Sequence, residues 1–147
     1  MPRTDRQFVD DLTRRLSALR PDTPPRWGRM TAPQMLAHCT HAVRYSLGKE
    51  GVSPREWNPF LQAIARPVVL SGLLSMPRNA KAPRIFEPGE GVADATALSI
   101  ELNEFVDRCG QPGFAPPPHP YFGDLGASGW SRLHALHMDH HARQFGV

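Results

Sequence analysis

Apolar residues recur every three or four positions in four stretches of the chain, the spacing expected of α-helices that each bury one face. The first stretch is residues 4–19, where the apolar stripe consists of Phe8, Val9, Leu12, Leu16 and Leu19. Arginines lie towards its end, which suits the dipole of a helix, and the prolines that follow Arg20 cannot continue one. The pattern therefore predicts a first helix over residues 4–19.

The second predicted helix has both of its ends marked in the sequence. Thr31 and Gln34 have the spacing of a capping box, a proline falls in the first turn, and Gly48 suits the end of the helix. One stripe of this helix is apolar and consists of Leu36, Val43 and Leu47. The opposite side carries His38 together with Gln34, Met35, His41, Ala42 and Tyr45. A helix with two such faces is expected between a hydrophobic core and an internal site.

A long, proline-rich connection follows over residues 49–91, and we expect one or two short helices within it around residues 60–74. A connection of this length allows the helices on either side of it to run parallel. Apolar positions from Val92 to Cys109 predict a third helix that ends at Gly110, and residues 111–124 form a stiff loop before the last helix. The expected fold class is all-α, in a single domain that covers residues 1–147.

The last predicted helix, Trp130 to Phe145, holds four of the seven histidines of the chain. At helical spacing one of its faces is charged and carries Arg132, Asp139 and Arg143, and His140 falls to one flank. The other face carries Trp130, His134, His137, Met138, His141 and Phe145. The imidazoles are therefore expected to point inward with the aromatic residues, which is unusual for a helix that only packs.

His137 and His141 stand one helical turn apart, about 6 Å along the axis, so that both rings could reach one metal ion. The third ligand must come from elsewhere, and His38 on the second helix is the natural candidate. Three neutral imidazoles from two helices suit a divalent transition metal with positions left for water or substrate. An isolated pair of histidines at this spacing is more often structural. The metal hypothesis therefore rests on two further observations, the inward orientation of both histidines and the presence of His38 on the second helix.

Composition narrows the classes of partner. The net charge of +3 comes from scattered arginines without a basic run, so we expect no nucleic-acid partner. The apolar residues 60–74 are interrupted by Arg66 and Pro67 and are too few to span a membrane. Cys39 and Cys109 do not have a metal-binding spacing, and the first residues lack the apolar core of a signal peptide. We therefore expect a reduced, cytoplasmic protein.

The run His137-Met-Asp-His-His-Ala-Arg-Gln144 resembles the signature in the last helix of the DinB/YfiT-like superfamily, and Met35-Leu-Ala-His38 resembles its second-helix histidine. The wider frame, which includes Trp27-Gly-Arg-Met and His119-Pro-Tyr-Phe-Gly, is similar to a branch known mainly as a domain of unknown function. The resemblance implies a four-helix bundle with a long crossover between helices two and three. It also implies a zinc or nickel ion held by His38, His137 and His141.

One departure from that signature concerns an arginine. The signature has arginine directly after the last histidine, whereas Ala142 stands there and Arg143 follows one place later. This displacement weakens the case for an anion-binding role of Arg143. His140, on the flank of the helix, is expected to support the ligands from outside or to be structural.

The resemblance also implies a function. Relatives include transferases and isomerases that use a low-molecular-weight thiol such as mycothiol, bacillithiol or glutathione. The expected function is a metal-dependent, thiol-using transferase that acts on an electrophilic small molecule, with Tyr45 or His41 handling protons. A metal-dependent hydrolase and a non-catalytic metal-binding or small-molecule-binding stress protein are the alternatives. Paired helical faces also allow a homodimer.

Each of the remaining candidates has a structural interpretation beside the functional one. The default for Tyr45 is a core tyrosine with a satisfied hydroxyl, and for His41 a partly exposed helix histidine. Cys39, next to His38, is expected to be a small buried residue rather than a nucleophile. His134 is expected to pack or to touch the pocket, and His119 to cover the mouth of the site or to stiffen its turn.

Overall fold

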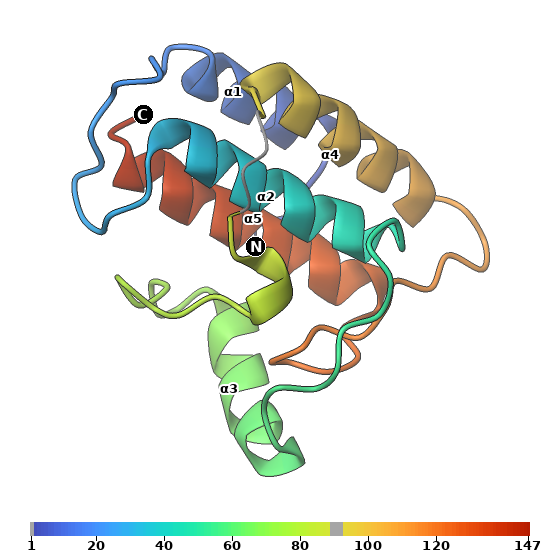
Figure 1. The fold of residues 1–147 in the computed structure, drawn as a ribbon. Coiled ribbons are helices and arrows are strands. Elements are labelled where there is room, and N and C mark those ends of the chain that lie inside the picture. The colour runs from blue at the N-terminus through green and yellow to red at the C-terminus, as the bar shows by residue number, and fades with distance from the viewer. Residues whose placement is uncertain (1, 89–92) are drawn as a thin grey trace.

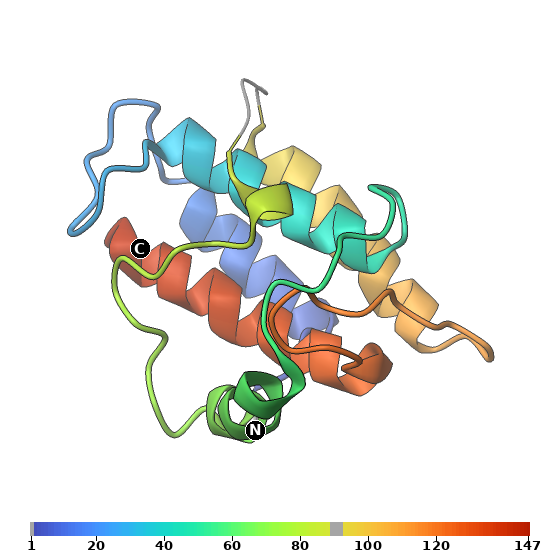
Figure 2. The ribbon, with the colours of Figure 1, turned by 60° about the horizontal axis from the view of Figure 1, so that its bottom comes forward.

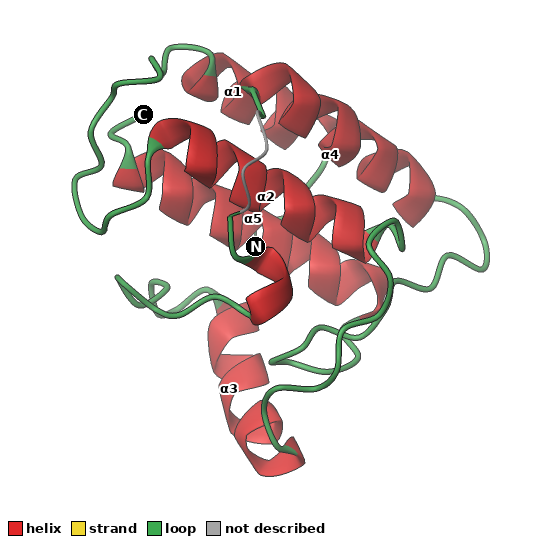
Figure 3. Cartoon of the chain, viewed as in Figure 1, coloured by secondary structure: helices red, strands yellow, loops and turns green. Residues whose placement is uncertain are grey.

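The computed structural model describes residues 2–88 and 93–147, which contain five α-helices, one turn of 3-10 helix and no β-strand. The α-helices are α1 (Arg6–Leu16), α2 (Ala32–Ser46), α3 (Pro59–Ser71), α4 (Ala95–Cys109) and α5 (Gly126–Gln144), and the 3-10 turn is η1 (Arg84–Phe86). Figure 3 shows these helices with the loops that join them. The all-helical bundle expected from the sequence is confirmed.

Side-chain caps fix where the helices begin. The Asp5 carboxylate accepts the Phe8 N–H at 2.8 Å, so α1 starts at Arg6 rather than at Thr4, and it ends at Leu16 rather than at Leu19. The Asp94 carboxylate accepts the Ala97 N–H at 2.8 Å in the same way. Helix α4 therefore begins at Ala95, and the start expected at Val92 lies outside the described residues.

Helix α2 has the predicted capping box. The Thr31 hydroxyl accepts the Gln34 N–H at 3.2 Å, and the Gln34 side-chain oxygen accepts the Thr31 N–H at 3.0 Å. The helix ends at Ser46, two residues before Gly48, whose φ of +76° suits glycine. The caps fix the two ends of α2, and its packing against α4, α5 and η1 covers the helix so well that only its N-terminal edge and a few positions reach solvent.

Four helices enclose the core. Helices α1 and α2 each pack against α4 and α5, and Figures 1 and 2 show α2 and α5 side by side. Every one of the four contributes buried apolar side chains, among them Val9, Leu12, Met35, Val43, Leu98, Leu102, Phe105, Trp130, Leu133 and Met138. Burial of these residues is the main source of the stability of the bundle.

The connection between α2 and α4 holds α3 and η1. Of the helices that the structure describes, α3 packs only against α5, and Figure 1 shows it projecting from the lower edge of the bundle. Its outer side and the residues after it expose Phe60, Ile64 and Leu73. The η1 turn packs on α2 and brings the chain back over the bundle. None of the helices in the described part of the chain has the length and apolar character needed to cross a membrane.

Candidate metal centre

Helices α2 and α5 bring three imidazoles to one point, as the sequence predicts. His38 comes from α2, and His137 and His141 come from successive turns of α5. The Nε2 atom of His137 lies 2.8 Å from Nε2 of His38 and 3.0 Å from Nε2 of His141. All three potential ligand atoms lie within 4.8 Å of one another. The three rings are close enough to hold a single metal ion.

The three rings meet edge to face. Their planes make angles of 84° between His38 and His137, 76° between His38 and His141, and 73° between His137 and His141. Rings arranged in this way point their nitrogens at a common centre and do not stack on one another. We call these three residues the histidine tripod.

In two of the three rings, a hydrogen bond holds the nitrogen that faces away from the centre. His38 Nδ1 lies 2.6 Å from the carbonyl oxygen of Phe86 in η1, and because that oxygen can only accept, Nδ1 carries the proton. His141 Nδ1 lies 2.7 Å from the side-chain oxygen of Gln144, whose amide nitrogen donates to the carbonyl oxygen of Trp27 at 2.9 Å. In both rings the proton is on Nδ1, so Nε2 turns a lone pair towards the centre.

Burial keeps the tripod neutral. Desolvation lowers the pKa of His137 well below its usual range, and the neighbouring imidazoles His141 and His38 lower it further. Burial also lowers the pKa of His38, and it lowers that of His141 to about 3. At neutral pH all three rings are therefore unprotonated at one nitrogen, which is the form that binds metals.

The donor set fits a transition metal. Two nitrogens bound to one tetrahedral zinc ion at 2.0–2.1 Å stand roughly 3.4 Å apart. The nitrogen separations of 2.8 and 3.0 Å are a few tenths of an ångström shorter, a difference that slight ring rotations can make up. Neutral imidazoles suit zinc, nickel, copper and iron, whereas calcium and magnesium prefer oxygen ligands.

The tripod lines a cavity of about 680 Å³. This volume is within the usual range of small-molecule sites. The wall is mainly apolar and includes Trp27, Met30, Trp57, Val69, Met76, Phe86, Tyr121, Phe122, Trp130 and Leu133. The side chains of Arg29 and Lys81 also border the cavity, and both residues are exposed. A small apolar molecule could therefore reach the tripod from this cavity.

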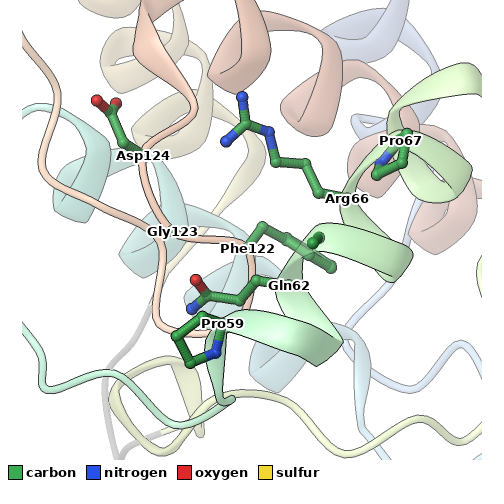
Figure 4. Close-up of a pocket in the computed structure, with 8 residues that line it drawn as sticks. Pro59, Gln62, Arg66, Pro67, Phe122, Gly123 and Asp124 are labelled. Atoms are coloured by element: carbon green, nitrogen blue, oxygen red, sulfur yellow. The ribbon is translucent and has the colours of Figure 1, made fainter.

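A second, smaller cavity of about 290 Å³ lies between α3 and residues 122–124 (Figure 4). Figure 4 shows Gln62 and Arg66 of α3 on one side of it and Gly123 and Asp124 on the other. Its lining residues include no histidine or cysteine, so it offers no ligand set comparable to the tripod. The chemistry of interest is in the larger cavity.

Tyr45 or His41 is expected to handle protons. Tyr45 is fully buried, and its hydroxyl donates to the Pro118 carbonyl oxygen at 2.7 Å and accepts the Ser53 N–H at 3.2 Å. Burial raises the pKa of this hydroxyl. His41 is partly exposed on α2. Among the described residues, neither borders the cavity that holds the tripod, and their catalytic role stays a prediction.

The other histidines of α5 occupy different environments. His134 is 1% exposed, and its Nε2 shares a hydrogen bond of 2.8 Å with the Ser46 hydroxyl. His140 meets the Trp27 ring edge to face and borders the cavity beside His141. Arg143 pairs with Asp139 at 2.6 Å on the exposed side of the helix, so its guanidinium is engaged away from the tripod.

Two supporting groups of the tripod were not assigned a role from the sequence. The Phe86 carbonyl belongs to the backbone and leaves no mark in a sequence pattern. Gln144 could have been found, because a side-chain acceptor three residues after a helical histidine lies on the same face.

A family model with the description "Protein of unknown function (DUF1569)" matches residues 6–146. No curated protein matches the chain, and no solved structure does.

Proposed function

The chain belongs to the DUF1569 family of proteins of unknown function, and we propose that it is a metal-dependent enzyme whose ion is held by His38, His137 and His141. The observation that supports this most strongly is the geometry of the tripod. Its Nε2 atoms lie 2.8 and 3.0 Å apart, and Phe86 and Gln144 hold two of the Nδ1 protons on the outside. Such outer partners orient metal-binding histidines and raise their basicity.

The proposal includes the nature of the ion and of the reaction. A zinc or nickel ion, when bound, supplies a Lewis acid that lowers the pKa of a thiol or a water molecule. We propose a thiol-dependent transfer, in which a low-molecular-weight thiol loses its proton to water and its sulfur attacks an electrophilic small molecule in the cavity. A carbon–sulfur bond forms as the electrophile loses a leaving group such as chloride or as its epoxide ring opens. The apolar wall would hold the electrophile and exclude water from its reacting atom.

The environments of the two cysteines favour a nucleophile that is not part of the protein. Cys39 is 1% exposed, and burial raises its pKa, so its thiol stays protonated at neutral pH. Burial also raises the pKa of Cys109. Neither residue borders the large cavity among the described residues. A thiol that reacts beside the tripod would therefore have to come from a small molecule.

The same geometry would also serve metal-assisted hydrolysis, with water in place of the thiol, or a non-catalytic metal-binding protein. We further propose that the family is related to the DinB-like superfamily, because the tripod combines His38 of the second helix with His137 and His141 of the last one. The small-molecule substrate, the cytoplasmic location and the homodimer stay predictions. Proton transfer by Tyr45 or His41 is not required by the proposal.

One experiment separates these functions. Zinc-loaded and nickel-loaded protein is incubated with a panel of electrophiles, such as 1-chloro-2,4-dinitrobenzene and an epoxide, with and without glutathione, mycothiol or bacillithiol. We expect consumption that requires the thiol and that stops when a chelator removes the metal. A His137→Ala variant should lose this activity, and Arg143→Ala, on the exposed side of the same helix, should keep it. Consumption of an electrophile without thiol would favour hydrolysis. If the fully metal-loaded protein consumed none of the electrophiles, an enzymatic role would be contradicted.

A further inference from the structure

Residues 119–123, His-Pro-Tyr-Phe-Gly, form a closed loop at the wall of the large cavity. The backbone N–H of His119 donates to the Gly123 carbonyl oxygen, and the N–H of Gly123 donates to the His119 carbonyl oxygen, both at 2.8 Å. Gly123 has a φ of +70°, a conformation that favours glycine. The carbonyl oxygen of Pro120 accepts the Glu56 N–H at 2.9 Å, which ties the loop to the segment before α3.

The loop fixes the protonation state of the His119 ring. His119 Nδ1 accepts the backbone N–H of Tyr121 at 3.0 Å and that of Phe122 at 3.3 Å. A nitrogen that accepts two N–H groups carries no proton of its own, so the proton of the neutral ring must be on Nε2. Burial lowers the pKa of His119 to about 3, so the ring stays neutral at physiological pH.

The ring is also held in place by its neighbours. It stacks on Phe122 with the ring centroids 4.7 Å apart, and it lies 5.2 Å from the Trp130 ring and 5.6 Å from the Phe86 ring. His119 is only 6% exposed. No hydrogen-bond partner for its Nε2 occurs in the described part of the chain. Nε2 is not among the unpartnered side-chain nitrogens that are fully shut off from the molecular surface, so an acceptor on a ligand in the cavity can reach its N–H.

His119 borders the same cavity as the histidine tripod. The cavity therefore has three imidazoles that can bind a metal in one part of its wall, and the fixed, uncharged N–H donor of His119 in another. A second donor, the indole N–H of Trp27, is buried in the wall without a partner among the described residues. An uncharged donor surrounded by aromatic rings favours an uncharged acceptor, because a charged group would lose its hydration on entering the cavity.

We propose that the large cavity binds a mainly apolar or aromatic molecule through an uncharged oxygen acceptor, such as a carbonyl, that receives the Nε2 proton of His119. This proposal deepens the proposed function, because it names the chemical class of the small molecule that the same cavity takes, but binding itself does not require the metal. A neutral imidazole can polarise a carbonyl oxygen while it holds it. His119 would thus favour ligands that carry such an oxygen over ligands of similar shape that lack it.

The test compares two probes of similar shape, acetophenone, which has a carbonyl acceptor, and ethylbenzene, which has none. Binding of each is followed by NMR titration of the isotope-labelled full-length protein, both with zinc and with a chelator. Loss of one hydrogen bond weakens binding by roughly fivefold to tenfold. We therefore expect the wild-type protein to prefer acetophenone by this factor under both conditions.

Two variants separate the ligand contact from the loop. Asparagine can place an oxygen near the Nδ1 position, so His119→Asn keeps an acceptor for the two backbone N–H groups but lacks the donor, and it should lose the preference. Glutamine can place an N–H near the Nε2 position, so His119→Gln should keep part of the preference. The loop is checked through the amide signals of Tyr121 and Phe122.

Three results would overturn the proposal. They are equal binding of the two probes by the wild-type protein, full preference in folded His119→Asn, and a preference that appears only with zinc. The last result would mean that the carbonyl oxygen binds the ion and not His119. A failure of metal binding would refute the proposed function but leave the preference of the metal-free protein intact, so the two failures can be told apart.

Discussion

Replacement of Gln144 by leucine tests whether the support of the tripod matters for metal binding. The Gln144 side chain is 5% exposed and joins two groups, the Nδ1–H of His141 at 2.7 Å and the Trp27 carbonyl oxygen at 2.9 Å. Leucine ends one bond earlier than glutamine, has the same fork at its end and carries no polar atom. The variant would keep most of the packing at this position and remove the acceptor that orients His141.

The expected loss follows from these two contacts. Without an acceptor on Nδ1, the His141 ring can rotate, and its proton can move to Nε2, the nitrogen that should bind the metal. Loss of such an outer partner typically weakens metal affinity by about 10-fold to 100-fold, which corresponds to about 1.4–2.8 kcal/mol. We expect Gln144→Leu to fall in this range.

Competition between the protein and a chromophoric zinc chelator measures this affinity directly. Arg143→Ala is the matched control, because Arg143 is the neighbouring residue and pairs with Asp139 on the exposed side of α5. It should bind zinc as the wild-type protein does. Wild-type affinity in a folded Gln144→Leu protein would refute the reasoning, since the hydrogen bond to His141 would then have no effect on the site.

Further predictions concern the pH dependence of stability, the strain caused by replacing a glycine, and the stabilisation of the protein by bound zinc. Burial lowers the pKa of His134 to about 3, so below its unfolded value near 6.5 only the unfolded chain takes up this proton. The free energy of unfolding of the metal-free protein should therefore fall by about 1.4 kcal/mol per pH unit for this residue as the pH drops from about 6.5 towards 3, and urea unfolding at pH 7 and pH 5 with equal stabilities would contradict this. In Gly28→Ala the new Cβ would lie 3.0 Å from the Gln144 amide nitrogen at a φ of +79°, so we expect a loss of about 1–2 kcal/mol and weaker zinc binding. Gly113→Ala has the same φ of +79° with nothing within 4 Å of its Cβ, and in a zinc titration it should match the wild-type protein. Zinc at about a thousand times its Kd should stabilise the wild-type protein by about 4 kcal/mol in thermal or urea unfolding. In His38→Ala this gain should largely disappear, and a full gain there would mean that zinc binds elsewhere.

The sequence predicted the helices well because their signals are local. The capping box of Thr31 and Gln34 involves two residues of one turn, and it is present in the structure. The inward face of α5 was also predictable, because its buried residues recur at helical spacing. The ends of α1 were less accurate, because apolar positions continue to Leu19 after the last helical turn has ended at Leu16.

The tripod could be predicted because histidine is rarely placed on three inward-facing positions of two helices without a reason. What holds the tripod could be predicted only in part. The Phe86 carbonyl reaches His38 through η1, at the end of a connection whose path depends on packing against α2. Backbone groups carry no sequence signal, so no pattern of residue types could identify this contact.

His119 illustrates a different limit. Its position in a proline-rich loop suggested either a cover for the site or a stiff turn. The structure combines the two, because the ring borders the cavity and its Nδ1 accepts two N–H groups of its own loop. Which nitrogen carries the proton depends on these hydrogen bonds, and they exist only once the loop is folded.

Metal content is the most direct test of the central claim, that His38, His137 and His141 form one metal site. Native mass spectrometry with elemental analysis of the purified protein, before and after incubation with zinc or nickel, gives the number of ions per chain. We expect one ion per chain, lost in a folded variant with alanine at all three positions. A folded wild-type protein that binds no zinc or nickel, or a triple variant that binds as much as the wild type, would contradict it.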